Sequence, residues 1–312
     1  MMDESALAVP QELLILAAAV ETGIIDNLNN KSMSAPELAR LMGADLRAVW
    51  VVTEALEALG YLAKKNGKLT LSREAREIFY NTGSQIYKGF SFMHRYNKIR
   101  SLVTLPEVIF TGKAHPKDKS REKTQYFMSA MSLSARQNAQ TIAGLCLEGI
   151  SQGAKVLDVG GGPLTYAKAF AALGANVTVL DTPEVVEYMS TFLNGEGKIE
   201  MAAGDFNQGL PAGPYSLLFL GNICHIYGEH ENRNLFKNSA QVLRPNGKIA
   251  ILDFVRGTGV RAAVFGVNML VSTVNGGTWT YDEYAEWLLD AGFYDVNYNS
   301  VNNKQILFAK KR

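Results

Sequence analysis

A glycine-rich turn between an apolar strand and a helix constrains the fold of this chain more than any other segment. The run Lys155–Val159 is apolar apart from Lys155 and Asp158, and three consecutive glycines follow it directly. Residues Thr165–Leu173 then read as a helix. Glycine lets the main chain approach a ligand closely, and the N-terminus of the next helix directs unpaired N–H groups to the same place. The segment therefore predicts a turn that binds a nucleotide-like ligand.

From residue 155 onward, apolar strands alternate with helical patterns. This alternation predicts an α/β fold with a parallel, doubly wound sheet. About five residues separate the last two strands, too few for a parallel crossover, so they should form an antiparallel hairpin. The predicted strands are residues 155–159, 176–181, 198–202, 215–221, 247–254, 292–298 and 304–309.

Residues 10 to about 80 have a different pattern, of short helices followed by a hairpin. Pro10 opens the first helix, and Ser34 with Glu37 forms a capping box for the next. A third helix, residues 46–59, carries an apolar stripe at helical spacing. Two short strands then flank the Asn66-Gly67 turn, which is a hairpin signal. Helices followed by such a hairpin predict a winged-helix domain.

Winged helices often bind DNA, so the charge of the third helix matters. It carries one arginine, Arg47, and two glutamates, Glu54 and Glu57. A helix that reads the major groove needs cationic and amide side chains on its exposed face. This one has too few, which favours a protein-interaction domain and no nucleic-acid partner.

Composition is that of an ordinary globular protein. The chain has 312 residues, 47% of them hydrophobic, and a net charge of +1, so no global field attracts nucleic acid or an anionic membrane. The apolar run Leu13–Val20 falls short of the roughly 20 residues that span a bilayer. Cys146 and Cys224 lack disulfide or metal-ligand spacing, which predicts no metal and two reduced thiols in a cytoplasmic protein.

The segment from residue 85 to residue 150 is mostly helical. It contains a run of aromatics and methionines, among them Phe127 and Met131. Core packing explains this composition, because methionine fills irregular gaps. The same residues also suit the wall of an apolar pocket for an aromatic substrate, and spacing alone leaves both interpretations open.

Acidic residues at three strand ends identify the ligand of the glycine turn. A dinucleotide fold needs a third glycine at a spacing that the sequence after Gly160 does not have. Asp158 precedes the glycines, where it repels a pyrophosphate and attracts an ammonium group. Asp181 ends the second strand and suits ribose hydroxyls, and Asp205 with Phe206 follows the third and suits an adenine. Singly, each aspartate could be a helix cap; together they predict S-adenosylmethionine.

Five segments in this order resemble the caffeate/hydroxyindole-type O-methyltransferases, including bacterial relatives: VLDVGGGP, VTVLDTPEVVE, GDFNQGLP, NICHIYGEHENRNLFKNSAQVLRPNGKIAILD and GGTWTYDEYAEWLLDAGF. The resemblance implies a class I methyltransferase domain with a Rossmann-like seven-stranded sheet, an N-terminal, mainly helical winged-helix dimerisation domain, and a homodimer. It also implies S-adenosylmethionine as the methyl donor and a small-molecule acceptor. The expected domains are residues 1–85 for dimerisation, 86–150 as a helical linker contributing to the acceptor pocket and dimer, and 151–312 for donor binding.

The resemblance also implies site residues. His225 follows the fourth strand and matches the family's candidate general base. The expected donor-binding residues are Asp158, Gly160, Gly161, Gly162, Asp181, Gly204, Asp205, Phe206 and Asn222. The expected acceptor contacts are Phe127, Met131, Asn268 and Met269, for which core packing is the competing interpretation.

Four departures from the family pattern bear on the chemistry. Ile226 and Tyr227 replace an aspartate and a tryptophan, and residues 276–280 lack the glutamate that orients the base in the plant enzymes. Leu164 stands where the family usually has another glycine. A histidine without a carboxylate partner predicts an acceptor needing little base assistance, such as an acidic phenol or a carbon or nitrogen nucleophile. A donor-binding homologue that methylates nothing, and a ligand-sensing winged-helix regulator, are the alternatives.

Overall fold

In the computed structural model, the described residues are 8–115, 120–193, 195, 197–301 and 304–312. Contacts divide the chain into two compact units, Met1–Ile99 with Arg121–Ala130 and Arg100–Ser120 with Met131–Arg312. The domain boundaries expected at residues 85 and 150 stay a prediction. Residues 1–7 of the first expected domain and residues 302–303 of the last lie outside the described residues.

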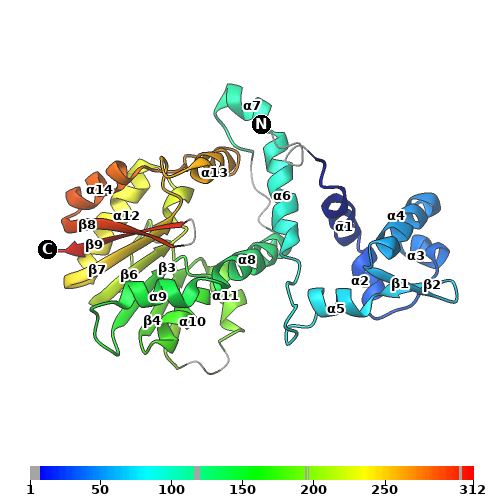
Figure 1. The fold of residues 1–312 in the computed structure, drawn as a ribbon, viewed down its shortest axis with the longest axis horizontal. Helices are drawn as coiled ribbons and strands as arrows, with labels where there is room; N and C mark the ends of the chain where they lie inside the picture. Colours follow the sequence, from blue (N-terminus) through cyan, green and yellow to red (C-terminus); the bar gives the residue numbers. More distant parts are fainter. Residues whose placement is uncertain (1–7, 116–119, 194, 196, 302–303) are drawn as a thin grey trace. The chain divides into compact units, whose positions relative to one another are not determined.

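The first unit consists of helices and one hairpin, coloured blue to cyan in Figure 1. Ser34 and Glu37 form the predicted capping box, and the Asp45 side chain caps the helix that follows. The strands pair antiparallel around Asn66-Gly67, as predicted, and an isolated bridge joins Met33 to Leu69. The helices that precede the hairpin in the described part of the chain are α1 (Gln11–Glu21), α2 (Ile24–Asn29), α3 (Ala35–Met42) and α4 (Leu46–Ala58). The hairpin is β1 (Leu62–Lys65) and β2 (Lys68–Leu71), and α5 (Arg73–Phe79) follows it.

Four further helices lie between residues 92 and 147, in agreement with the helical prediction for this stretch. They are α6 (Phe92–Val103), α7 (Leu105–Thr111), α8 (Arg121–Arg136) and α9 (Ala139–Leu147). The unit boundaries fall inside α6 and α8, so each of these helices contributes residues to both units.

The second unit is built on a seven-stranded sheet with the order β5-β4-β3-β6-β7-β9-β8. Strands β3 to β7 pair in parallel, whereas β9 runs antiparallel to both of its neighbours. The antiparallel pairing of the last two strands confirms the predicted hairpin. The strands are β3 (Lys155–Val159), β4 (Asn176–Asp181), β5 (Ile199–Ala203), β6 (Tyr215–Gly221), β7 (Leu243–Asp253), β8 (Phe293–Val301) and β9 (Lys304–Lys311).

Helices cover both faces of this sheet (Figure 1). The strand order runs outward from β3 to β5 in one direction and from β6 to β7 in the other. Since crossovers between parallel strands are right-handed, α10 (Thr165–Ala172) and α11 (Pro183–Ser190) cover one face. For the same reason α12 (Glu229–Val242) covers the other face, and α14 (Tyr281–Asp290) packs beside it. A short helix, η2 (Cys224–Ile226), follows β6, and α13 (Val260–Leu270) follows β7.

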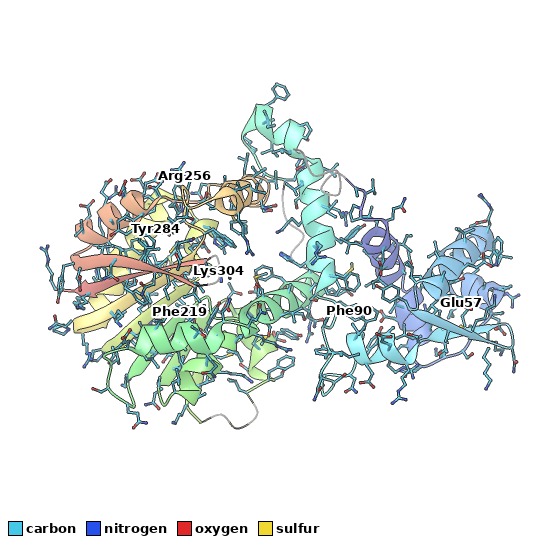
Figure 2. The ribbon with its side chains drawn as sticks, viewed as in Figure 1. Glu57, Phe90, Phe219, Arg256, Tyr284 and Lys304 are labelled. Atoms are coloured by element: carbon cyan, nitrogen blue, oxygen red, sulfur yellow. The ribbon has the colours of Figure 1, made fainter. Side chains whose placement is uncertain are left out.

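The core of the second unit lies between the sheet and these helices. Its largest fully buried side chains include Phe219 of β6 and Tyr284 of α14, both labelled in Figure 2. The alternation of buried strands and amphipathic helices therefore produces the predicted doubly wound α/β sheet. No helix among the described residues is long and apolar enough to cross a membrane.

Candidate functional site

The glycine turn lies at the carboxyl edge of the sheet, against the segment that follows β6. Gly160 has a φ of 67°, a conformation that favours glycine. A Cβ on Gly160 would lie 2.1 Å from the Cδ1 atom of Ile223. The turn after β3 and the loop that carries His225 therefore approach each other more closely than a larger residue would permit.

Asp158 is a buried carboxylate beneath this turn. Asp158 is 1% exposed, and its Oδ2 atom has no hydrogen-bond partner among the described residues. Burial, together with the negative charge of Asp181, raises the pKa of Asp158 to about 8. A Cβ on Gly161 would lie 2.3 Å from Oδ2, so the glycine leaves the carboxylate oxygen open toward the turn. A buried acid without a hydrogen-bond partner, next to a glycine turn that leaves its oxygen open, fits the ammonium group of S-adenosylmethionine.

Asp181 ends β4 beside the same turn. Its Oδ2 atom accepts a hydrogen bond from the Gly162 N–H at 2.9 Å, and its Oδ1 atom accepts one from the Thr182 N–H at 2.8 Å. Burial raises the pKa of Asp181, and these two hydrogen bonds partly oppose that rise. The carboxylate thus fixes the glycine turn to the start of α11 and leaves lone pairs for hydroxyl donors.

The third acidic strand end is more exposed. The Asp205 Oδ1 atom accepts hydrogen bonds from the main-chain and side-chain nitrogens of Asn207, both at 2.9 Å. Phe206 is buried, and its ring meets Tyr227 edge to face with centroids 4.8 Å apart. The Gly204 N–H donates to the Asp181 carbonyl at 2.9 Å. Because β3, β4 and β5 are neighbours, the three acidic positions follow adjacent strands along one edge of the sheet.

Leu164 caps the N-terminus of α10 with a left-handed backbone conformation. Its φ is 60°, a region that glycine occupies far more readily than leucine. Its side chain is 0% exposed. A side chain that lined an open cleft would be accessible to solvent, so the Leu164 side chain packs into the core and lines no open cleft in the described part of the chain.

His225 lies in η2 and is held by Asp253, the last residue of β7. The His225 Nδ1 atom is 2.6 Å from the Asp253 Oδ1 atom, and the His225 main-chain N–H donates to Oδ2 at 3.1 Å. Both residues are buried, His225 at 6% exposure and Asp253 at 0%. The expectation that the histidine lacks a carboxylate partner is therefore wrong. Asp253, at the end of β7, supplies the carboxylate that residues 276–280 lack.

Asp253 is itself fixed by further donors. The Tyr284 hydroxyl donates to Oδ2 at 3.2 Å, and the Phe254 N–H donates to Oδ1 at 2.7 Å. A carboxylate accepting several hydrogen bonds in a buried position stays in one orientation. It holds a proton on Nδ1 of His225 and leaves Nε2 as the free acceptor.

Neighbouring loops fix the main chain around His225. The Gly277 N–H donates to the His225 carbonyl at 3.0 Å, and a Cβ on Gly276 would lie 2.4 Å from the same oxygen. The Asn232 side chain donates to the Cys224 carbonyl at 2.9 Å, and the Trp279 indole donates to it at 3.2 Å. Gly276 thus contributes close packing and Gly277 a main-chain hydrogen bond, where the family's segment also contributes a glutamate.

An aromatic pair lies beside the imidazole. Phe254 and Phe265 stack with centroids 4.1 Å apart and an interplanar angle of 28°. Phe265 meets the His225 ring edge to face at 4.8 Å. Rings in this position suit a flat, apolar ligand next to the histidine.

Asn222 follows β6, and its side chain contacts the first residue of β9. It has a φ of 61°, and its N–H donates to the Leu252 carbonyl at 2.9 Å. Its Oδ1 atom accepts a hydrogen bond from the Lys304 Nζ atom at 3.4 Å. Asn222 thus lies at the same edge of the sheet as His225, and a lysine that the sequence interpretation did not single out lies beside it.

The expected acceptor contacts fall on two helices, α8 and α13. Met131 of α8 precedes Ser132, whose hydroxyl is 3.2 Å from the Thr165 hydroxyl at the start of α10. In α13, Asn268 is buried with an unpartnered Oδ1 atom, and Met269 is half-buried. Phe127 of α8 belongs to the first unit, where it is 38% exposed and meets the His94 ring edge to face.

Three residues near the site were missed by the sequence interpretation: Asp253, Tyr284 and Lys304. Asp253 was recognisable, because it ends a strand with an acid just as Asp158 and Asp181 do. Tyr284 and Lys304 carry no such signal, since a tyrosine in a helix and a lysine at the start of a strand are ordinary residues.

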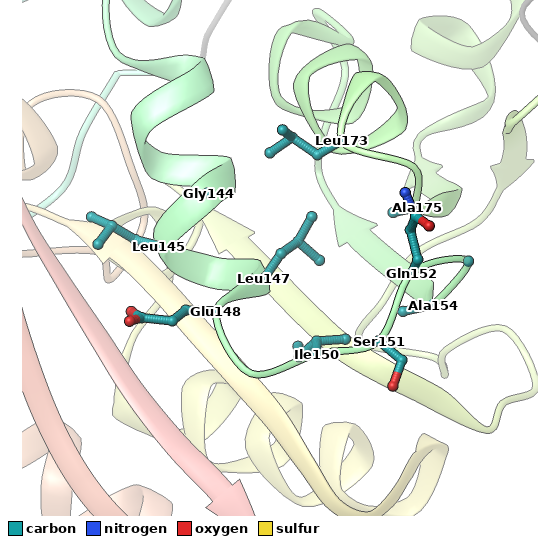
Figure 3. A pocket seen from close by; sticks show the side chains of 11 residues that line it. Gly144, Leu145, Leu147, Glu148, Ile150, Ser151, Gln152, Ala154, Leu173 and Ala175 are labelled. Atoms are coloured by element: carbon teal, nitrogen blue, oxygen red, sulfur yellow. The ribbon is translucent and has the colours of Figure 1, made fainter.

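A cavity in the described part of the chain lies away from this site (Figure 3). It measures about 510 Å³ and lies at the amino ends of β3 and β4, whereas His225 and the glycine turn lie at the carboxyl ends. None of the expected site residues lines it. Open solvent-facing space between α9 and the following turn accounts for it, and we assign it no function.

Comparison with known proteins identifies the family. Residues 101–294 match the O-methyltransferase domain, more than half of the chain. The 3-hydroxy-5-methyl-1-naphthoate 3-O-methyltransferase of Streptomyces sahachiroi is 26% identical over 90% of this chain and 86% of its own length. The tetracenomycin polyketide synthesis 8-O-methyltransferase TcmO of Streptomyces glaucescens is 24% identical over 94% and 91%.

A solved structure agrees with the fold. PigF, a protein of a Serratia species solved with S-adenosylhomocysteine, matches 100% of both chains at 21% identity, with a TM-score of 0.75. The chain therefore belongs to the O-methyltransferase family and is an S-adenosylmethionine-dependent methyltransferase.

Proposed function

We propose that this protein methylates a hydroxyl oxygen of a small aromatic or polyketide-like acceptor, with His225 as the general base. The observation that carries the proposal is the buried contact of 2.6 Å between the His225 Nδ1 atom and the Asp253 carboxylate. A hydroxyl acceptor must lose a proton during methyl transfer, and this pair leaves Nε2 available to accept it.

The donor-binding residues would be those around the glycine turn. Asp158 would face the donor's ammonium group, Asp181 its ribose, and Asp205 with Phe206 its adenine. Gly160, Gly161, Gly162, Gly204 and Asn222 would leave room for it along the strand ends. When bound, the sulfonium supplies an activated methyl group for in-line displacement.

The protein's own contribution is to position the acceptor and move one proton. Correct positioning alone supplies effective molarities on the order of 10⁵–10⁸ M. His225 takes the hydroxyl proton at Nε2, and the Asp253 carboxylate stabilises the imidazolium that results. General-base catalysis of this kind contributes roughly 10²–10⁴-fold.

The acceptor class rests on the relatives and on the surrounding rings. A naphthoate and a polyketide product are named for the two curated relatives, and both are aromatic or polyketide-type molecules. The stacked pair Phe254 and Phe265 beside His225 suits such a flat acceptor. We also infer that Met131, Asn268 and Met269 of the second unit contact it, as expected from the family.

A histidine variant tests the proposal. The protein is incubated with labelled S-adenosylmethionine and a panel of hydroxynaphthalenes and hydroxybenzoates, and labelled product is identified. We expect His225→Ala to lower turnover by about 10²–10⁴-fold while S-adenosylhomocysteine still binds. His230→Ala is the matched control, because His230 is exposed in α12 and bonds only to Asn234 among the described residues.

Three outcomes contradict the proposal. Unchanged turnover in His225→Ala excludes a histidine base, and methyl transfer to carbon or nitrogen excludes the hydroxyl acceptor. Donor binding without any methylated product indicates a donor-binding homologue that does not methylate.

We further propose that the N-terminal domain forms a homodimer and that the protein works in the cytoplasm. Both cysteines are buried free thiols, which suits a reducing compartment. Helices α3 and α4 and the residue after them expose large apolar side chains that a partner would cover: Leu41, Leu46, Trp50, Val51 and Leu59. Light scattering on the full chain should give a dimer, and Trp50→Ser with Val51→Ser should shift it to monomer.

A further inference from the structure

Two cationic side chains lie beside the ring of Phe254. The Lys304 Nζ atom is 5.8 Å from the ring centroid, and the Arg261 Cζ atom is 5.4 Å from it. Lys304 is the first residue of β9, labelled in Figure 2, and Arg261 is in the first turn of α13. Residues from two separate elements therefore bring two positive charges to one aromatic ring.

Neither cation has an acidic partner within the described residues. Lys304 donates only to the neutral Asn222 side chain, at 3.4 Å, and Arg261 contacts only the ring. Lys304 is largely desolvated, and its pKa is lowered by burial and by the charge of Arg261, although Asp253 opposes the shift. Asp253 already accepts hydrogen bonds from His225, Phe254 and Tyr284. Lys304 is partly buried without a counterion among the described residues, and the exposed Arg261 adds a second positive charge at the same ring, so an anion bound beside Phe254 would be stabilised.

The position of this pair relative to His225 follows from the sheet. Gln305 pairs with Asp253 across β9 and β7, so Lys304 stands next to the carboxyl end of β7. Phe254 follows Asp253 directly, and Phe265 contacts both the Phe254 ring and the His225 ring. The two cations and the candidate base therefore adjoin the same aromatic pair, the cations at Phe254 and the imidazole at Phe265.

We propose that the methyl acceptor is an aromatic hydroxy acid whose carboxylate binds Lys304 and Arg261. Its ring packs on Phe254 and Phe265, and its hydroxyl group faces Nε2 of His225. This inference rests on the proposed function and names the substrate class of the same site. A carboxylate also occurs in the methionine part of the donor. We assign the cations to the acceptor because Arg261 and Phe265 belong to α13, which also carries the expected acceptor contacts Asn268 and Met269.

The experiment compares acids with their neutral esters. Hydroxynaphthoic and hydroxybenzoic acids and their methyl esters are titrated into the protein loaded with S-adenosylhomocysteine, and binding is followed by fluorescence. We expect the wild type to bind at least one acid about tenfold or more tightly than its ester, since charged hydrogen bonds are strong. Lys304→Met and Arg261→Met should each remove most of this preference. Lys304→Arg, which keeps the charge, should retain it.

Controls separate this inference from general damage and from donor binding. Lys310→Met, on the same strand but paired with Asp295 at the surface, should leave the acid preference unchanged. S-adenosylhomocysteine affinity should change less than twofold in Lys304→Met. Loss of that affinity assigns the lysine to the donor carboxylate and overturns the proposal, as does a wild type that binds no acid more tightly than its ester. Acid-selective binding without turnover leaves this inference standing and contradicts the proposed function instead.

Discussion

The Asp253 carboxylate and the His225 imidazole form a buried pair in which Oδ1 and Nδ1 are 2.6 Å apart. The carboxylate also accepts the His225 main-chain N–H, so it fixes the position of the residue and the orientation of its ring together. This arrangement removes the need for a glutamate in the 276–280 segment. It supports a full base role for His225, including toward acceptors that are not strongly acidic.

Asp253→Asn should lower turnover by on the order of 10²–10⁴-fold, the contribution of a general base. The asparagine amide cannot accept from Nδ1 with the strength of a carboxylate, and it cannot stabilise the imidazolium. Steady-state kinetics with an acceptor found in the panel measures the loss. S-adenosylhomocysteine affinity, measured by calorimetry, should stay within a few-fold of the wild type.

Tyr284→Phe is the matched control for that variant. It removes one donor from Asp253 and leaves the contact with His225 in place. We expect a loss of stability of about 1 kcal/mol, typical of one buried hydrogen bond, and a much smaller loss of turnover than in Asp253→Asn. Equal losses of turnover in the two variants would mean that Asp253 acts through general packing.

The Asp253 pair illustrates what the sequence could and could not predict. The strand ending at residue 253 was predictable from its apolar run, and so was its place in a parallel sheet. The pairing with His225 depends on β6 and β7 being neighbours, with Gly221 opposite Leu252. That register brings together two residues 28 positions apart in the sequence. No local sequence pattern predicts this pairing. An acid at a strand end was nevertheless the same signal that identified Asp158.

The sheet was more predictable than the environment of single residues. Hydrophobic periodicity and the short connection between β8 and β9 determine strand order only coarsely, but they were enough to predict the reversed last strand. β7 begins at Leu243, four residues before the predicted strand, because Leu243 pairs with Tyr215 before a register shift. The unpaired state of Lys304 and Arg261 could not be predicted, since it depends on which acids lie nearby in space.

Asp158→Asn should strongly weaken donor binding. The unpartnered Oδ2 atom is the acid available to the donor's ammonium group, and an amide offers no full negative charge. Calorimetric titration with S-adenosylhomocysteine should show a loss of at least about tenfold, the scale of one charge-assisted hydrogen bond. Asp205→Asn, at a more exposed position, should have a smaller effect. Unchanged affinity in Asp158→Asn would remove this residue from the donor site.

The raised pKa of Asp158 predicts that the stability of the ligand-free protein depends on pH. Burial raises the pKa of Asp158 to about 8, whereas an aspartate in the unfolded chain titrates near pH 4. Between these values the native state keeps a proton that the unfolded chain releases, so stability falls as pH rises, by up to about 1.4 kcal/mol per pH unit. Urea unfolding of Asp158→Asn should show a smaller slope, which retains the contribution of the raised pKa of Asp181. A wild type whose stability does not fall in this window contradicts the burial argument.

Gly161→Ala tests whether the glycine turn next to Asp158 must be free of side chains. The added Cβ would lie 2.3 Å from the carboxylate oxygen, so either the turn or the side chain must move. We expect S-adenosylhomocysteine binding to become undetectable by calorimetry. Gly144→Ala is the control, because this glycine lies in α9 with open space around its Cβ position. It should raise stability by up to about 1 kcal/mol and leave donor binding unchanged.

Leu164→Gly separates packing from ligand binding at the one position where the turn departs from the family pattern. Glycine relieves the left-handed backbone strain, worth roughly 1–2 kcal/mol. The same change removes a side chain that is 0% exposed, and truncating a buried leucine costs about 2–5 kcal/mol. The lost packing equals or exceeds the relieved strain, so the variant should be less stable by up to about 4 kcal/mol while donor affinity at low temperature stays near that of the wild type. Thermal unfolding and calorimetry measure the two quantities separately. Tighter donor binding in Leu164→Gly would show that the leucine side chain does obstruct the site.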